Sequence, residues 1–223
     1  MERLLPLLAL VVTGASSFLA FHQGSRGPGP STWAWLVSAA VALAALCLFY
    51  LRREETLVDT IKLEPGDISR GIGGAALGIG LALAAGEVGL RVAPNRTAEE
   101  VLQLLRVRQA VTPEVKRAGL VIAAAFAEEI VWRGAVTQAL AVRVGSRWAP
   151  WLASALAVLA VVPTMRPGLV LGSIAVGAIT SGLVQRFRGR IAPAMVAHAA
   201  LTWVVSEIVL LHFWQKIRAL YSL

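Results

Sequence analysis

The chain has 223 residues, 57% of them hydrophobic and 15% charged, a formal net charge of +8 and a mean hydropathy of +0.70. Soluble domains have about 25% charged residues, so this composition leaves no room for a separate soluble domain and indicates one integral membrane domain over residues 1–223. The basic residues cluster between apolar runs without interleaved aromatic residues, which excludes nucleic acid as the expected partner and leaves membrane lipid.

Seven apolar runs of roughly membrane-spanning length follow one another along the chain. They predict an all-α, polytopic membrane helix bundle of about seven transmembrane helices, with six to eight as the range. The runs are roughly Leu4–Phe21, Trp33–Leu51, Ile72–Leu90, Ala118–Ala141, Trp148–Pro163, Gly168–Val184 and Ile191–Phe213.

The first run has two interpretations. Arg3 precedes an apolar core, and Ala15-Ser16-Ser17 fits a signal-peptide cleavage site. We favour a retained helix, because everything that follows is also membrane protein. The link between Phe21 and Thr32 is rich in Gly and Pro and is predicted to be a turn-rich loop.

The link before the fourth run is predicted to contain a short helix. Thr97 and Glu100 have the spacing of a capping box, and the apolar residues after them favour a helix at the membrane interface, with Arg106 and Arg108 facing outward. The basic residues of the short loops favour a cytoplasmic N-terminus, whereas this basic connector argues against it. The excess of Arg over Lys and the abundance of Ala indicate a bacterial plasma membrane.

Small residues recur at the spacing that lets helices approach closely. Gly74 and Gly78 form a GxxxG pattern, and Ser173, Gly177 and Ser181 form a series of small residues four apart. Both patterns are typical of close helix–helix contacts in membranes.

The fourth run, Ala118–Ala141, contains the charged motif Glu128-Glu129-Ile130-Val131-Trp132-Arg133. Ionised groups at membrane depth are expensive and usually functional. Glu129 and Arg133 share a helical face and can form an i,i+4 pair. Glu128 lies about 100° away around the helix, without an obvious partner, so it is suited to take a proton from water. In the structural alternative, the Glu–Arg pair only links helices and Glu128 is held protonated by a neighbouring carbonyl.

The last run contributes an imidazole. His198 and Thr202 share a helical face, about two turns inside the membrane from the basic link Arg186–Arg190. That link and Arg143–Arg147 are expected on the same side of the membrane, so Glu128 and His198 could face one another across the bundle. Such a pair could activate a water molecule or stabilise an oxyanion. In the structural alternative, the histidine donates to a backbone carbonyl.

A metal site is not expected. The only histidines are His22, His198 and His212, there is no HExxH pair, and catalytic zinc usually has three protein ligands. The single Cys47 lies in an apolar run and is expected to be a small core residue.

The order Glu128-Glu129-x-x-x-Arg133-Gly134, a basic turn, two further runs and Ala192-Pro193-x-x-x-Ala197-His198 resembles the CPBP intramembrane protease family. This family includes the type II CAAX prenyl endopeptidases and the bacterial Abi-type proteins. The resemblance covers about Ala118 to Leu211, so a CPBP-like catalytic core is expected over residues 118–211.

The resemblance implies a glutamic-type intramembrane endopeptidase that needs no cofactor and acts on a membrane-embedded or lipidated protein or peptide. Glu128 would activate the attacking water, and Glu129 and Arg133 would shape the site. His198 would polarise the scissile carbonyl together with Thr202, which stands where the family has asparagine.

One family motif is altered. The Phe-x-x-x-His motif aligns best with Val158 and Val162, and valine cannot help to hold water. The protein therefore either holds its water differently, with Thr164 or His198, or is an inactive pseudoprotease that binds membrane segments. A proton-coupled carrier with Glu128 and His198 as its relay is a third alternative, which the absence of repeated halves makes the least favoured.

Overall fold

The structure is a computed structural model that describes residues 4–21, 30–111 and 113–221. Every regular element within these ranges is helical, which confirms the all-α prediction for them. The helices are α1 (Leu5–Phe21), α2 (Pro30–Arg53), α3 (Leu57–Ile61), α4 (Asp67–Val92), α5 (Pro94–Gln109), α6 (Glu114–Glu129), π-helical η2 (Ile130–Val136), α7 (Thr137–Val144), α8 (Ala149–Val161), 3-10 helical η3 (Val162–Thr164), α9 (Pro167–Arg186), α10 (Ala192–Val204), π-helical η4 (Val205–Val209) and α11 (Leu210–Tyr221). Most of the predicted turn-rich link, with His22, lies outside the described residues.

Four helices in the described part of the chain are long and apolar enough to cross a bilayer, namely Trp33–Arg53, Asp67–Val92, Pro167–Arg186 and Ala192–Tyr221. Large apolar side chains are exposed on several of these helices, as contact with lipid requires. The protein thus has the helices of an integral membrane protein. The apolar helices Leu5–Phe21 and Ala149–Thr164 are shorter than the roughly 20 helical residues that cross a membrane core of about 30 Å.

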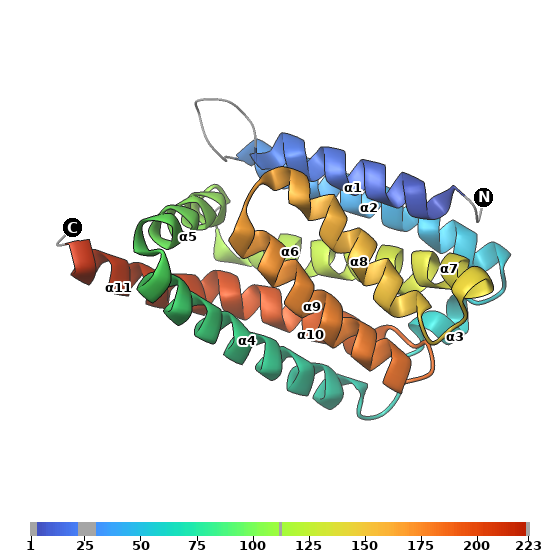
Figure 1. Ribbon diagram of the computed structural model, residues 1–223. Coiled ribbons are helices and arrows are strands. Elements are labelled where there is room, and N and C mark those ends of the chain that lie inside the picture. Colours follow the sequence, from blue (N-terminus) through green and yellow to red (C-terminus); the bar gives the residue numbers. More distant parts are fainter. Residues whose placement is uncertain (1–3, 22–29, 112, 222–223) are drawn as a thin grey trace.

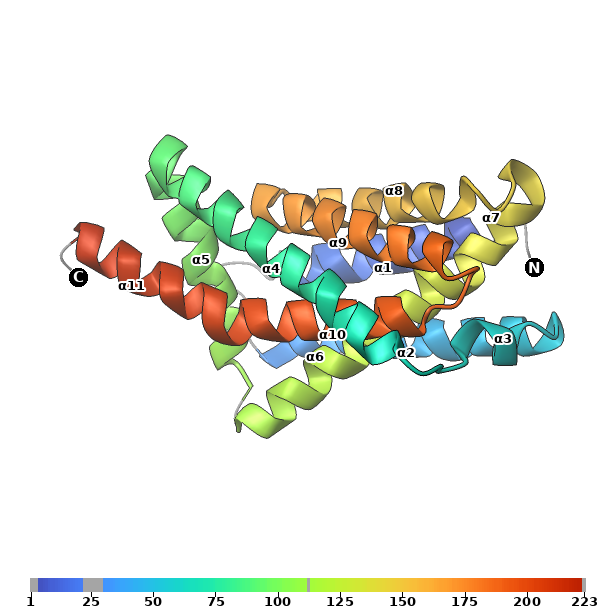
Figure 2. The ribbon, with the colours of Figure 1, turned by 90° about the horizontal axis from the view of Figure 1, so that it is seen from below.

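The continuous helical segment from α6 through η2 to α7 lies at the centre of the packing. α6 packs against α2 and α10, and η2 contacts α1, α2, α8 and α9. In Figures 1 and 2, α4 runs beside α10, and α8 runs beside α9. The chain's first two helices and its later helices therefore meet on the segment that carries the charged motif.

Glycines allow α4 to approach α9 and α10 closely. A Cβ atom on Gly78 would lie 2.6 Å from Leu201 Cδ2, and one on Gly74 would lie 3.1 Å from Leu183 Cδ1 and 3.3 Å from Ala197 Cβ. The GxxxG pattern therefore marks a close helix–helix contact, as predicted.

The second series of small residues joins α8 to α9. Ser154 Oγ donates a hydrogen bond to the carbonyl of Gly177 at 3.1 Å, and Ser181 Oγ donates to the carbonyl of Pro150 at 2.8 Å. Ser173, at the start of the series, is half-buried. Hydrogen bonds from serine hydroxyl groups to backbone carbonyls thus join these two apolar helices.

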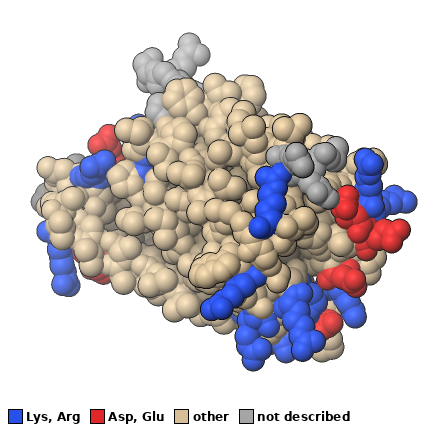
Figure 3. All heavy atoms as spheres, turned by 45° about the vertical axis from the view of Figure 1, so that its right-hand side comes forward, with Lys and Arg blue, Asp and Glu red and all other residues tan. Residues whose placement is uncertain are grey.

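Charged side chains gather at both ends of the bundle, in a larger group at the right of Figure 3 and a smaller group at its left, with a broad apolar surface between them. Gln185 Nε2, near the end of α9, donates a hydrogen bond to the carbonyl of Arg147 at 3.3 Å. The two basic links, which were expected on one side of the membrane, therefore lie at the same end of the bundle. The fully buried Asp67 accepts hydrogen bonds from Arg190 at 2.6 Å and from Arg70 at 3.1 Å. These contacts fix the start of α4 and the start of α10 at the same end.

The predicted connecting helix is α5, and one of the two arginines expected to face outward is placed differently from the prediction. The helix begins at Pro94 rather than after Thr97. Arg108 points inward and its NH2 group lies 2.8 Å from Glu207 Oε2. The prediction that Arg108 faces outward is wrong, because an acid on η4 offers the guanidinium a partner inside the bundle.

Candidate active site

The charged motif lies where an α-helix changes into a π-helix. The helix α6 ends at Glu129 and η2 begins at Ile130. At the end of η2, both the backbone N–H and the side-chain hydroxyl of Thr137 bond to the carbonyl of Trp132, the latter at 2.8 Å. Single π-helical turns occur frequently at functional sites. Arg133 lies within this turn and is buried.

Glu129 is fully buried and lies between two cationic or potentially cationic groups. Its Oε2 lies 3.5 Å from Arg133 Nε, so the predicted i,i+4 pair is present. Its Oε1 lies 2.8 Å from Nδ1 of His198 on α10. Because an ionised carboxylate only accepts hydrogen bonds, the imidazole donates to it from Nδ1. Glu129 thereby sets the orientation of the ring, a role that its pairing with Arg133 did not indicate.

Glu128 approaches the other nitrogen of the same imidazole. His198 Nε2 lies 3.7 Å from Glu128 Oε2, and 43% of the Glu128 side chain is exposed. The expected meeting of these two residues across the bundle is therefore present. At 3.7 Å the contact is longer than a hydrogen bond, so the Glu128 carboxylate remains free to bind another group.

The four groups form a chain of alternating sign, from Arg133 through Glu129 and His198 to Glu128. With both carboxyl groups ionised and both basic groups protonated, the four charges cancel. A buried ionic cluster is tolerated when its members are paired. The arrangement therefore presents one oriented imidazole and one available carboxylate side by side.

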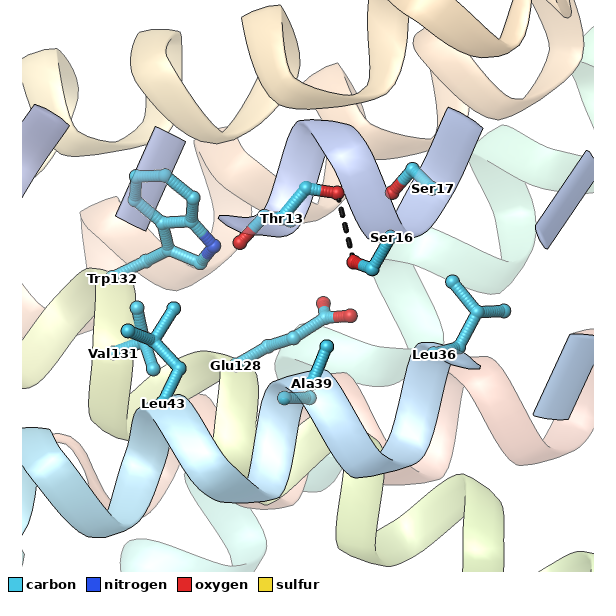
Figure 4. A pocket seen from close by; sticks show the side chains of 10 residues that line it. Thr13, Ser16, Ser17, Leu36, Ala39, Leu43, Glu128, Val131 and Trp132 are labelled. Atoms are coloured by element: carbon cyan, nitrogen blue, oxygen red, sulfur yellow. Dashed lines mark hydrogen bonds between the residues drawn. The ribbon is translucent and has the colours of Figure 1, made fainter. Parts of the chain in front are cut away.

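A small cavity opens beside the Glu128 carboxyl group (Figure 4). The space open to the centre of a water molecule is about 20 Å³, and a single water needs roughly 10–15 Å³ of such space. Hydroxyl residues of α1, apolar residues of α2 and the α6–η2 junction line it, namely Thr13, Ser16, Ser17, Leu36, Ala39, Ala40, Leu43, Glu128, Val131 and Trp132. The cavity has room for a water molecule next to the acid.

The hydroxyl groups of α1 were not predicted to belong to the site. Thr13, Ser16 and Ser17 have the i, i+3, i+4 spacing of one helical face, inside a run that hydropathy describes only as apolar. That spacing was the available signal. It shows that three hydroxyl groups share a face, but not what they face.

Thr202, one turn after His198, is half-buried. Within the described residues its side chain makes no hydrogen bond, so the hydroxyl group is available. Thr202 lies on the same helix as His198, and no hydrogen bond joins its side chain to Glu128.

Val162, the position aligned with the missing family histidine, does not line the cavity at Glu128. The helix α8 ends at Val161, one residue before Val162, and the side chain of Val162 is 43% exposed. Pro163 explains the early end, because proline has no backbone N–H to continue the i→i−4 hydrogen bonds of the helix. The buried positions of α8 are Ala149, Pro150, Ala153, Ser154 and Ala160. Thr164 is buried in η3 but does not line the cavity at Glu128.

No three His, Cys, Asp or Glu side chains among the described residues come together as a metal site would require. Cys47 is a buried free thiol, as its position in an apolar run predicts. His212 lies 3.8 Å from Glu87, at the α11 end of the protein rather than at Glu128.

Comparison with known protein families gives a match over the part of the chain that carries these residues. The model of the type II CAAX prenyl endopeptidase Rce1-like family matches residues 113–204. The match runs from the start of α6 to the end of α10, and it contains Glu128, Glu129, Arg133, His198 and Thr202. Neither the curated proteins nor the solved structures include a match to this chain. Residues 113–204 therefore form a domain of the Rce1-like type II CAAX prenyl endopeptidase family.

Proposed function

We propose that the protein is a glutamic-type intramembrane endopeptidase, in which Glu128 activates water and His198 polarises the scissile carbonyl. The observation that carries this proposal is the 3.7 Å approach of His198 Nε2 to Glu128 Oε2, together with a cavity lined by Glu128 that has room for one water. A general base and an oxyanion donor must both reach the reacting group, and these two side chains are neighbours.

In the proposed reaction, Glu128 takes a proton from the bound water as the water oxygen attacks the peptide carbonyl carbon. The carbonyl oxygen becomes an oxyanion that accepts a hydrogen bond from Nε2–H of His198, while Nδ1–H stays bonded to Glu129. Protonated Glu128 then gives its proton to the peptide nitrogen, the C–N bond breaks, and a carboxyl and an amino terminus result. The hydroxyl group of Thr202 is proposed as a second donor to the oxyanion.

The substrate class follows from the family and the setting. The family acts on proteins, and the site lies within an integral membrane domain, so the proposed substrate is a membrane-embedded or lipidated protein or peptide. We place the enzyme in a bacterial plasma membrane. We also propose that α1, α8–η3 and the segment from α6 to α7 cross the membrane, which gives about seven spans with residues 118–211 as the catalytic core.

The test is cleavage by purified protein in proteoliposomes. The substrates are a peptide ending in a prenylated CAAX sequence and a set of single-span membrane peptides, with the products identified by mass spectrometry. Wild type and the exposed control Glu54→Gln are expected to cleave at similar rates, and Glu128→Gln to lose roughly 10²–10⁴-fold in kcat. Equal turnover by wild type and Glu128→Gln would falsify the proposal.

One observation favours a second candidate, a pseudoprotease that binds membrane segments without cutting them. The buried face of α8 carries alanine, serine and proline and no imidazole. The same proteoliposomes separate the two candidates: a pseudoprotease would be photo-crosslinked to a membrane peptide and would yield no product with any substrate of the set. Product formation that depends on Glu128 excludes it.

A further inference from the structure

The helix α1 presents hydroxyl groups to the Glu128 carboxyl group from the opposite wall of the cavity. Thr13, Ser16 and Ser17 line that wall, and every other lining residue except Glu128 and Trp132 is aliphatic. Figure 4 shows the Ser16 hydroxyl group and the Glu128 carboxyl group pointing toward one another. A water molecule in this space therefore has two kinds of oxygen partner, one on α6 and one on α1.

The hydrogen bond that Ser16 makes decides which role it can play toward that water. Its Oγ donates to the backbone carbonyl of Thr13 at 3.0 Å, and the residue is only 7% exposed. The single hydroxyl proton is thus committed to the helix, and the oxygen lone pairs remain to accept a hydrogen bond. Ser16 is consequently an acceptor in the cavity.

We infer that Ser16 holds the nucleophilic water of the proposed endopeptidase by accepting one of its protons in a hydrogen bond. This inference rests on the proposed function. Glu128 accepts the other proton, so both O–H bonds of the water are directed at the protein. The lone pairs of the water are then free to attack a carbonyl carbon. Ser16 thus provides a hydrogen-bond acceptor for the water in this cavity. The buried face of α8 provides no imidazole that could do so.

Two substitutions test separate parts of this arrangement. Ser16→Ala removes the acceptor and leaves the space, and Ala39→Val keeps the acceptor and fills space in a cavity of about 20 Å³. Each is expected to lower kcat roughly 10- to 100-fold, the effect of losing one hydrogen bond to a reacting group, with KM and the thermal midpoint little changed. A merely structural role would move KM and the thermal midpoint instead.

Thr180→Ala is the matched control. Thr180 is a buried helical residue whose hydroxyl group donates to the carbonyl of Val176 at 2.8 Å, as Ser16 donates to Thr13, but it lies outside the cavity. It is expected to keep the kcat of wild type. If Glu128→Gln abolishes cleavage while Ser16→Ala keeps kcat within about twofold, the role of Ser16 is overturned and the proposed function stands. If Glu128→Gln cleaves normally, the proposed function itself fails.

A second measurement needs no substrate. An experimental structure at a resolution that shows ordered water is expected to contain one water within about 3 Å of both Ser16 Oγ and a Glu128 carboxyl oxygen. The same structure of Ser16→Ala should show that water displaced or absent. A dry cavity in wild type, or an unchanged water in the variant, would overturn the inference.

Discussion

The imidazole of His198 is bonded through Nδ1 to Glu129 at 2.8 Å and faces Glu128 with Nε2 at 3.7 Å. Of the two adjacent glutamates, Glu129 is hydrogen-bonded to the imidazole ring and Glu128 only approaches it. Glu129 is buried and bonded to this ring, whereas Glu128 is partly exposed and lines the small cavity. This division supports Glu128 as the base and Glu129 as the residue that orients the histidine.

Removal of the orienting acid should destabilise the protein as well as stop cleavage. Glu129→Ala leaves Arg133 buried without its counter-charge and His198 without its acceptor. Loss of one member of a buried ion pair costs about 3–5 kcal/mol, so the free energy of unfolding in a detergent titration should fall by that amount. The control Glu54→Ala, at an exposed position, should change it by less than about 0.5 kcal/mol. A Glu129→Ala protein as stable as this control would contradict the assigned ion pair.

A second buried ionic cluster should hold α5 and α6 to η4. Arg117 is 2% exposed and bonds to both carboxylate oxygens of Glu207, at 2.5 and 2.8 Å. Arg117→Met should cost about 3–5 kcal/mol of stability because Glu207 loses its main partner. Glu114 lies 3.9 Å from the same guanidinium but is 83% exposed, so Glu114→Ala should have little effect. Equal losses of unfolding free energy for the two variants would argue against this cluster.

The close approach of α4 and α10 predicts opposite effects at two neighbouring glycines. A Cβ atom on Gly71 would lie 2.5 Å from Val196 Cβ and 2.8 Å from the carbonyl of Pro193. Gly71→Ala should therefore cost about 1–3 kcal/mol by overpacking and should lower cleavage by displacing the helix that carries His198. Gly73 has no atom within 4 Å of such a Cβ, so Gly73→Ala should retain or gain stability, by up to about 1 kcal/mol. Thermal unfolding of both variants checks this, and similar shifts would refute the packing.

The exposed end of α8 predicts that Val162→His does not restore a catalytic histidine. The side chain points outward and lies beyond the end of the helix, so an imidazole there cannot reach the water at Glu128. The cleavage rate should stay within about twofold of wild type, that is, within about 0.4 kcal/mol of barrier height. A rate increase of tenfold or more would show that α8 places this position in the site after all.

Much of the fold can be predicted from local pattern. Hydropathy identifies the membrane helices, because an apolar run must satisfy its backbone hydrogen bonds within itself in lipid. The spacing of Glu129 and Arg133 identifies their ion pair, because helical periodicity places residues four apart on one face. The motif order also identified the family domain. The catalytic roles of Glu128, Glu129, Arg133, His198 and Thr202 remain predictions.

Other features required the tertiary structure. The sequence alone determined that an acid and an acid–base pair lie together in one apolar run and that an imidazole lies in a later one. Only the packing decided that His198 bonds to Glu129, that Ser16 faces Glu128, that Val162 points away and that Arg108 turns inward. Periodicity fixes which residues share a face of one helix, but not which other helix that face meets. That choice depends on contacts between residues far apart in the chain, such as those between α4 and α10, which no local pattern encodes.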